Sequence, residues 1–269
     1  MKDKIVIISG ASSGIGKAIA YEFGKKGAKV VLAARSISKL LEIANDLEKL
    51  GITALAVKTD VTSENDCHLL IEKTIEKFGR IDILINNAGI SMRALLVDLQ
   101  LDVMRKVMDT NYWGTVYCTK FALPYLLKTG GSLVGMISVG GYIGLPGRSA
   151  YSAAKFAIRG FLDSVRVENR KTGLHVLVVA PGFTTSNIRR AALLADGSPQ
   201  GETPRDENHM MPAEEVASHV YKAVMKKKRR LVLTFYQGKL TVLVSKIFPN
   251  LVDRQVYKTF AEEPDSPLK

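Results

Sequence analysis

Tyr151 and Lys155 stand four residues apart in a stretch whose apolar pattern predicts a helix. Residues at this spacing share one helix face, so the phenol and the ammonium should lie near each other. A phenol with a pKa near ~10 is a poor acid–base group at neutral pH. A neighbouring positive charge stabilises the phenolate and lowers that pKa. The pair therefore predicts a side chain that gives and takes a proton.

Two further polar residues belong to the same hypothesis. Ser138 follows an apolar run and stands thirteen residues before Tyr151, so its hydroxyl can stabilise charge developing on a substrate oxygen. Asn111 lies in the stretch Asp-Thr-Asn-Tyr-Trp-Gly. Taken singly, each has a simpler reading: a surface-helix pair, a loop serine and a helix-end asparagine. No G-x-S-x-G sequence surrounds Ser138, which disfavours a nucleophilic serine.

The first apolar run leads into Ser-Gly-Ala-Ser-Ser-Gly-Ile-Gly, with glycines at Gly10, Gly14 and Gly16. An ordinary turn from a strand to a helix needs one glycine. Three allow a tight turn and let a pyrophosphate approach the N–H groups at the start of the helix. The spacing predicts a nucleotide-binding turn.

The second apolar run ends at Ala34 and Arg35. A carboxylate at this place binds the ribose hydroxyls of NAD and would repel a 2′-phosphate. Ala34 removes that repulsion, and Arg35 offers a planar cation suited to phosphate. The cofactor predicted is NADP(H); the alternative is that Arg35 is a solvated surface arginine.

In this order the motifs resemble the short-chain dehydrogenase/reductase family, with Ser9 in place of its usual threonine. The resemblance covers about residues 5–233. It implies that Tyr151, Lys155, Ser138 and Asn111 are catalytic, with Asn111 holding a water that links Lys155 to solvent. It also implies contact of the cofactor with Gly10, Ser12, Ser13, Gly14, Ile15, Gly16, Arg35, Asp60, Val61, Asn87, Ala88, Gly89, Tyr151, Lys155, Pro181, Gly182, Thr184 and Ser186.

Within that family, the sequence from Asn87 to Ser91, the Ser149-Ala150-Tyr151 site and the basic apolar tail give a narrower likeness. They resemble the 11-beta-hydroxysteroid dehydrogenase-like and 3-ketosphinganine reductase-like branch. That resemblance implies a lipidic carbonyl substrate and, often, association with membranes. No N-terminal anchor is evident, so the tail would have to provide any attachment.

The elements that must position these residues alternate between short apolar runs and amphipathic stretches. This pattern predicts an α/β fold, a doubly wound Rossmann-type sheet of seven parallel strands in a single domain. The strands are predicted at residues 4–9, 29–33, 53–58, 82–86, 132–137, 175–180 and 230–234. Helices are predicted at 16–26, 38–50, 64–78, 104–127, 151–171 and 213–226, with Pro124 bending or shortening the fourth.

The domain is expected to span residues 1–234, with a polar substrate lid at 184–212 and a C-terminal amphipathic helical extension at 235–269. The substrate cleft should lie at the carboxyl edge of the sheet, near Ser138, Met92, Tyr142 and Phe183. Its apolar character favours a hydrophobic ketone such as a sphingoid base, steroid or acyl chain. A 3-oxoacyl carrier-protein reductase and a cofactor-sensing binding protein are the alternatives.

Half of the net charge of +12 lies in residues 226–269, which hold ten Lys/Arg against four Asp/Glu. A basic amphipathic segment lies on anionic membranes or packs on a subunit or on its own core, and the sequence leaves these open. We expect a homodimer or homotetramer, cytoplasmic or peripheral on the inner membrane face. Scattered cysteines and histidines predict no metal site, and the clustered charge without interleaved aromatics predicts no nucleic-acid binding.

Overall fold

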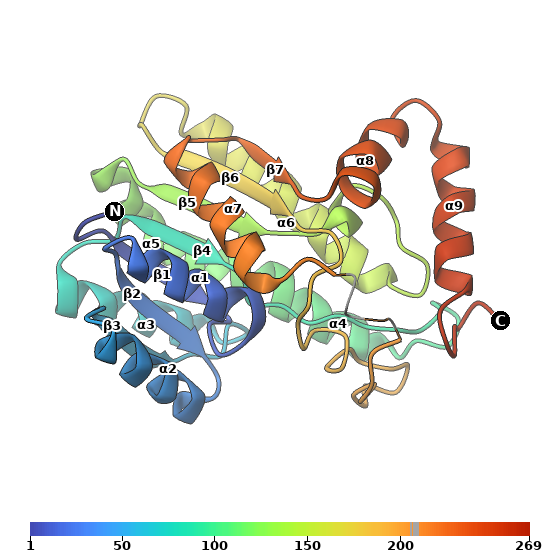
Figure 1. The fold of residues 1–269 in the computed structure, drawn as a ribbon, viewed down its shortest axis with the longest axis horizontal. Coiled ribbons are helices and arrows are strands. Elements are labelled where there is room, and N and C mark those ends of the chain that lie inside the picture. The colour runs from blue at the N-terminus through green and yellow to red at the C-terminus, as the bar shows by residue number, and fades with distance from the viewer. Residues whose placement is uncertain (205, 207–209) are drawn as a thin grey trace.

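A computed structural model describes residues 1–204, 206 and 210–269 (Figure 1). Within them, seven strands form one parallel sheet in the order β3-β2-β1-β4-β5-β6-β7. The strands are β1 (Ile5–Ser9), β2 (Lys29–Ala34), β3 (Ala54–Lys58), β4 (Ile83–Asn86), β5 (Ser132–Met136), β6 (His175–Ala180) and β7 (Arg230–Val232). The predicted doubly wound α/β fold is confirmed.

Helices cover both faces of the sheet because its strands are apolar on both sides (Figure 1). Val6 and Ile8 of β1 face one helical layer, and Ile5 and Ile7 face the other. The first layer is α1 (Gly14–Lys25), α2 (Ile37–Lys49) and α7 (Ala213–Met225). The second is α3 (Glu64–Phe78), α5 (Gly114–Thr129) and α6 (Ser149–Glu168).

The strand order reverses beside β1, which pairs with β2 on one side and with β4 on the other. The segments that follow these strands therefore diverge to opposite faces and leave a crevice at the carboxyl edge. The glycine turn after β1 and Asn87-Ala88-Gly89 after β4 both lie at this point. The fold thus brings together motifs that are far apart in the chain.

Residues 104–127 are helical as predicted, but they do not form a single α-helix. The chain forms α4 (Leu101–Met108), a π-helical turn at Asp109–Trp113 that contains Asn111, and then α5. Two hydroxyls bond carbonyls next to this turn: Thr115 Oγ1 donates to Asn111 O at 2.8 Å, and Thr110 Oγ1 donates to Lys106 O at 2.8 Å. Pro124 lies inside α5, which continues to Thr129 instead of ending early.

The segment at 184–212 has no helix or strand in the residues that the structure describes; 205 and 207–209 of the predicted lid lie outside them. Single bridges hold it at Met92–Leu193 and Thr184–Met211. Its first part lies against both of the cavities described below. Its role as a lid stays a prediction.

The strand predicted at 230–234 is two residues too long. Thr234 has φ +64° and turns the chain into a π-helical turn at Phe235–Leu240. A Cβ at Gly238 would stand 2.0 Å from Leu233 O, so only glycine fits this turn. The tail continues as α8 (Thr241–Val244) and α9 (Pro249–Ala261). Among the described helices, none has the length and apolar character needed to cross a membrane.

Candidate active site

Two adjoining cavities lie at the carboxyl edge of the sheet, and both include Ile15, Asn87, Gly89, Ser186 and Ile188. The larger, of about 710 Å³, we call the nucleotide cavity. Its lining includes these predicted cofactor residues: Gly10, Ser12, Ser13, Gly14, Ile15, Arg35, Asp60, Val61, Asn87, Ala88, Gly89 and Ser186. The smaller, of about 170 Å³, we call the catalytic cavity; Ser138, Tyr151, Lys155, Pro181, Gly182, Phe183 and Thr184 lie in its wall.

The glycine turn rests directly on the segment after β4. Gly10 has φ +66°, and a Cβ there would stand 2.8 Å from Ala88 Cα. Asn87 Nδ2 donates to Ser9 O at 3.0 Å, and Ser9 Oγ accepts from the N–H groups of Asn87 and Ala88, each at 3.0 Å. Serine in place of threonine at position 9 therefore still bonds this segment. Gly16 does not line the cavity; it packs against Gly10 O, which a Cβ would approach to 2.3 Å.

One end of the nucleotide cavity carries two cations. Ala34, Arg35 and Lys39 all lie in its wall, with Lys39 in the first turn of α2. The sequence reasoning found Arg35 and missed Lys39, although its position four residues later was a usable signal. The carboxylate Asp60 also lines the cavity, where its Oδ1 accepts from Thr62 N at 3.0 Å and Thr62 Oγ1 at 2.8 Å. Glycine N–H groups and paired cations fit a phosphorylated dinucleotide.

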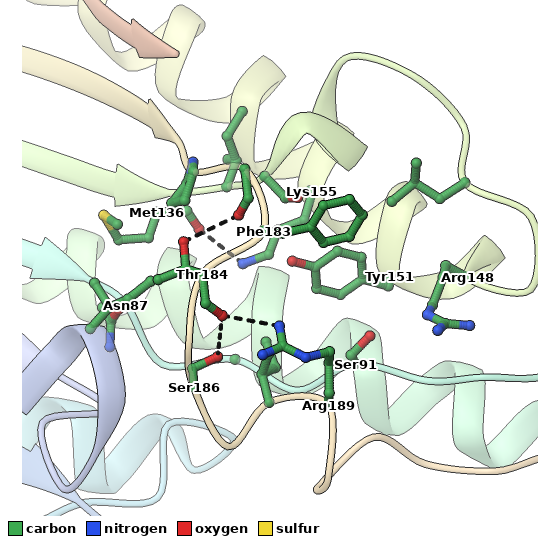
Figure 2. Close-up of a pocket in the computed structure, with 18 of the residues that line it drawn as sticks. Asn87, Ser91, Met136, Arg148, Tyr151, Lys155, Phe183, Thr184, Ser186 and Arg189 are labelled. Carbon is green, nitrogen blue, oxygen red and sulfur yellow. Dashed lines mark hydrogen bonds between the residues drawn. The ribbon is translucent and has the colours of Figure 1, made fainter. Parts of the chain in front are cut away.

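Tyr151 and Lys155 enter the catalytic cavity from the first two turns of α6 (Figure 2). Lys155 Nζ lies 5.6 Å from the centre of the Tyr151 ring and donates to Met136 O at 2.9 Å. Burial lowers the pKa of Lys155 to about 8. The Ser138 hydroxyl lies in the same cavity wall and lowers the pKa of the Tyr151 phenol. The structure thus places an acid–base phenol, a hydroxyl and a buried amine at one site.

The balance of forces on Tyr151 differs from the sequence expectation. Burial is the largest influence and raises the pKa of the phenol above its ordinary value. The hydrogen bond from Ser138 and the charge of Arg148 lower the pKa, but by less. The phenol is therefore protonated at neutral pH, and the protonated form is the one that can donate a proton.

Asn111 lies beneath this group and is fully buried. Its Oδ1 accepts from Ile90 N at 2.8 Å, and its Nδ2 donates to Ile90 O at 2.9 Å. A Cβ on Gly89 would stand 3.0 Å from Asn111 Oδ1 and 3.5 Å from Lys155 Nζ. The side chains of Asn111 and Lys155 therefore both lie next to Gly89, where a larger residue would crowd them.

The predicted substrate residues divide into two groups. Ser138 and Phe183 lie in the wall of the catalytic cavity. Met92 is fully buried against Leu193 and its neighbours, and Tyr142 packs against the tail with Arg159 4.3 Å from its ring centre. Neither of these two lines either cavity.

Sequence reasoning missed that the tail reaches this cavity. Phe260 and Glu263 lie in its wall, together with Arg148 and Arg189. Arg189 also bonds the lid segment, donating through Nη1 to Thr184 O at 3.0 Å (Figure 2). The adjacent glutamates Glu262 and Glu263 stand out in the tail sequence, but the sequence does not indicate which residues they contact.

Comparison with known proteins agrees with this geometry. The family described as short chain dehydrogenase matches residues 4–195. Dehydrogenase/reductase SDR family member 7B of Mus musculus is 36% identical over 259 residues, which cover 94% of this chain and 80% of that protein. An 11-beta-hydroxysteroid dehydrogenase A of Arachis hypogaea is 34% identical over 277 residues, covering 98% of this chain and 78% of that protein.

Two solved structures have the same fold. An alcohol dehydrogenase of the archaeon Thermococcus sibiricus, complexed with 5-hydroxy-NADP, has a TM-score of 0.76 at 25% identity, covering 86% of this chain and 94% of that one. A short chain dehydrogenase/reductase of Burkholderia phymatum, in complex with NAD, has a TM-score of 0.82 at 20% identity, covering 94% and 95%. The two hold different nicotinamide dinucleotides, so they do not distinguish NADP from NAD.

Proposed function

Because the chain belongs to the short-chain dehydrogenase family, we propose that it is an NADP(H)-dependent oxidoreductase that interconverts a carbonyl and a secondary alcohol on a hydrophobic substrate. The observation that carries the proposal is that the Tyr151 phenol shares one cavity with Ser138 and Lys155, and that this cavity adjoins the nucleotide cavity. Carbonyl reduction needs a hydride from a nicotinamide and a proton for the oxygen. A proton donor beside a dinucleotide site can provide both.

In the direction of reduction, a bound NADPH supplies the hydride to the carbonyl carbon. Tyr151 donates its proton to the carbonyl oxygen, and Ser138 donates a hydrogen bond to the same oxygen while negative charge develops there. Lys155, with a pKa of about 8, gives and takes protons near neutrality and can reprotonate the phenol. Asn111 bonds the backbone of Ile90 and so helps to fix the position of the residues that pass the proton from Lys155 to Tyr151.

Preference for NADP(H) rests on Arg35, Lys39 and the absence of a carboxylate at Ala34. A 2′-phosphate carries the negative charge that two cations at one end of the cavity would bind. NAD lacks this phosphate and would gain little from either residue.

A hydrophobic substrate is supported by the apolar part of the catalytic cavity. Its apolar members are Ile15, Met136, Ile137, Leu145, Phe183, Ile188 and Phe260. Steroid, sphingoid and acyl-chain carbonyls share this requirement. The relative named for 11-beta-hydroxysteroid dehydrogenase activity makes a lipidic ketone the first class to test.

Two other functions suit parts of this site. A 3-oxoacyl carrier-protein reductase would use the same reaction, with basic residues docking the acidic carrier. A cofactor-sensing protein would bind NADPH without turnover, but it has no need of the relay formed by Tyr151, Lys155 and Asn111.

For the tail we propose peripheral membrane contact in addition to its packing on the domain. Phe235, Tyr236, Leu243, Ile247, Phe248 and Leu251 are exposed there, near the basic residues Lys239, Lys246 and Arg254. We further propose a homodimer or homotetramer formed through the helical segments that carry Asn111 and Tyr151; on the second of these, α6, Phe156 and Val167 are exposed.

Oxidation of NADPH and NADH, measured with a panel of ketones, tests the proposal. The panel holds 3-ketosphinganine, a steroid ketone and a 3-oxoacyl thioester. We expect turnover of a lipidic ketone with NADPH preferred. Tight NADPH binding without turnover of any carbonyl would favour the sensor, and preference for NADH would remove the role given to Arg35.

A further inference from the structure

The C-terminal tail, residues 235–269, folds back onto its own domain beyond the carboxyl edge of the sheet (Figure 1). Val242 and Val252 are buried against Val139 and Ile143, which follow β5. After α9 the chain turns, and Ser266 Oγ donates to Phe260 O at 2.7 Å. This turn places the end of the tail at the substrate side of the site.

Glu263 is the polar centre of that contact. Its Oε2 lies 3.5 Å from Arg93 Nη2 and 3.5 Å from Arg148 Nη2. Only 3% of the Glu263 side chain is exposed, against 8% for Arg93 and 11% for Arg148. Arg93 also donates to Pro264 O. A buried carboxylate between two arginines is a built ion-pair site and not a solvated surface contact.

The two arginines come from different segments, and of the two it is Arg148 that lies in the wall of the catalytic cavity with Glu263. Arg93 follows β4, whereas Arg148 immediately precedes α6 and its Tyr151. Arg148 lies on the side of Tyr151 away from Met136 and Asn87 (Figure 2). Phe260 lies with its ring centre 5.7 Å from Arg148 Cζ, and Pro267 packs against Gly147. Phe260, Glu263 and Arg148 thus close one end of the space that Tyr151 enters.

An arginine facing a substrate pocket, such as Arg148, is a strong site for a carboxylate, because the guanidinium plane matches it with paired hydrogen bonds. Here an internal carboxylate already takes that place. A second carboxylate brought beside Glu263 in this desolvated space would be repelled by it and would have to share its arginines.

We propose that Glu263 is a specificity-determining residue: its carboxylate, paired with Arg93 and with the cavity-lining Arg148, excludes ketones that carry an anionic group at this end of the cavity. The inference rests on the proposed carbonyl reduction and names its substrate class further, as ketones uncharged near the carbonyl. Phe260 provides the apolar part of the same wall.

The test uses aryl ketones with a carboxylate one to four carbons from the carbonyl, and the methyl ester of each. The measured quantity is the ratio of kcat/KM for the acid to kcat/KM for its ester. Wild-type enzyme should favour the esters. Glu263→Gln, which keeps the shape and removes the charge, should raise the ratio by about tenfold or more for at least one acid. Because both substrates use the same Tyr151, effects on the chemical step cancel.

Glu262→Gln is the matched control, since 66% of that neighbouring side chain is exposed and it should leave the ratio unchanged. Arg148→Gln is a second variant, which should lower the ratio because Glu263 then keeps only one partner arginine near the pocket. A ratio that stays within about twofold of wild type across the series in both Glu263→Gln and Arg148→Gln would overturn the proposal.

A second measurement is the ratio of the dissociation constants of acid and ester, determined by titration calorimetry on the NADPH-bound protein. This ratio does not depend on turnover. Absence of turnover with every ketone would count against the proposed function alone. Equal affinities of wild type and Glu263→Gln for each acid, relative to its ester, would count against the role of Glu263.

Discussion

Lys155 Nζ lies 5.6 Å from the centre of the Tyr151 ring, and it bonds Met136 O at 2.9 Å. The amine is held by the backbone at the end of β5, at a fixed place beneath the phenol. Burial keeps the pKa of Lys155 at about 8 and raises that of Tyr151. Near neutral pH the pair therefore holds protons on both groups, which is the state needed to reduce a carbonyl.

Removal of the phenol hydroxyl should abolish the chemistry and spare binding. Tyr151→Phe should lower kcat by about 10²- to 10⁴-fold, because the proton donor is lost. The dissociation constant of NADPH, measured by fluorescence, should stay within about twofold of wild type. Tyr142→Phe is the control: this tyrosine lines neither cavity, and it should keep wild-type kcat. Equal losses in both variants would contradict the role of Tyr151.

Loss of the Ser138 hydroxyl should change both rate and pH dependence. Ser138→Ala should lower kcat by about 10²-fold, since a hydrogen bond to the developing oxyanion is removed. The Ser138 hydrogen bond lowers the pKa of Tyr151, so the variant should have a higher phenol pKa. Reduction needs the protonated phenol, and its alkaline decline should move to higher pH. The profile of kcat/KM against pH measures this, and a shift to lower pH would refute it.

The buried ammonium of Lys155 should lower the free energy of unfolding of the cofactor-free protein. Burial lowers its pKa from 10.5 to about 8. Between these values the unfolded chain binds more protons than the folded one, so this group's contribution to the free energy of unfolding rises with pH. Below pH 8 the penalty is at its full size. Lys155→Met should thus unfold with a free energy about 1–3 kcal/mol higher at pH 7.

The advantage of Lys155→Met should shrink as pH rises from about 8 towards 10.5. Urea unfolding of the cofactor-free proteins at several pH values measures it. Lys120→Met, which removes an exposed lysine of α5, should show no such trend. A variant less stable than wild type at pH 7, or a difference independent of pH, would show that the buried ammonium carries no penalty.

Cofactor preference should depend on Arg35 and Lys39, two of the cations that line the nucleotide cavity. Arg35→Gln and Lys39→Gln should each raise the KM for NADPH, about tenfold for Arg35, and leave that for NADH within about twofold. Ala34→Asp should add repulsion of the 2′-phosphate and favour NADH. Lys49→Gln, on the same helix but 77% exposed at its other end, is the control. Parallel losses for both cofactors would rule out recognition of the phosphate.

Much of this architecture was predictable because its signals are local. Apolar runs buried on both faces mark the parallel strands, and glycines Gly10 and Gly14 mark the turn that needs positive φ. Tyr151 and Lys155 share a helix face wherever the ends of that helix lie, because they stand four residues apart. Such patterns do not depend on which distant segment packs against them.

What the sequence did not reveal depends on distant contacts. The π-helical turn contains Asn111, whose side chain bonds Ile90 from a distant segment, and the apolar pattern of the sequence does not indicate this turn. The burial of Glu263 follows from the return of the tail to Arg93, 170 residues earlier in the chain. Met92 seemed to face the cleft, but the lid segment covers it.

The most direct test of the central claim follows the hydride itself. Wild-type protein is given NADPH with deuterium at the transferred position together with the best ketone of the panel, and the product alcohol is analysed by mass spectrometry. We predict an alcohol with one deuterium on the carbinol carbon, formed by wild type and Tyr142→Phe but not by Tyr151→Phe. Oxidation of the cofactor without deuterium in the alcohol, or equal product from Tyr151→Phe, would contradict the account.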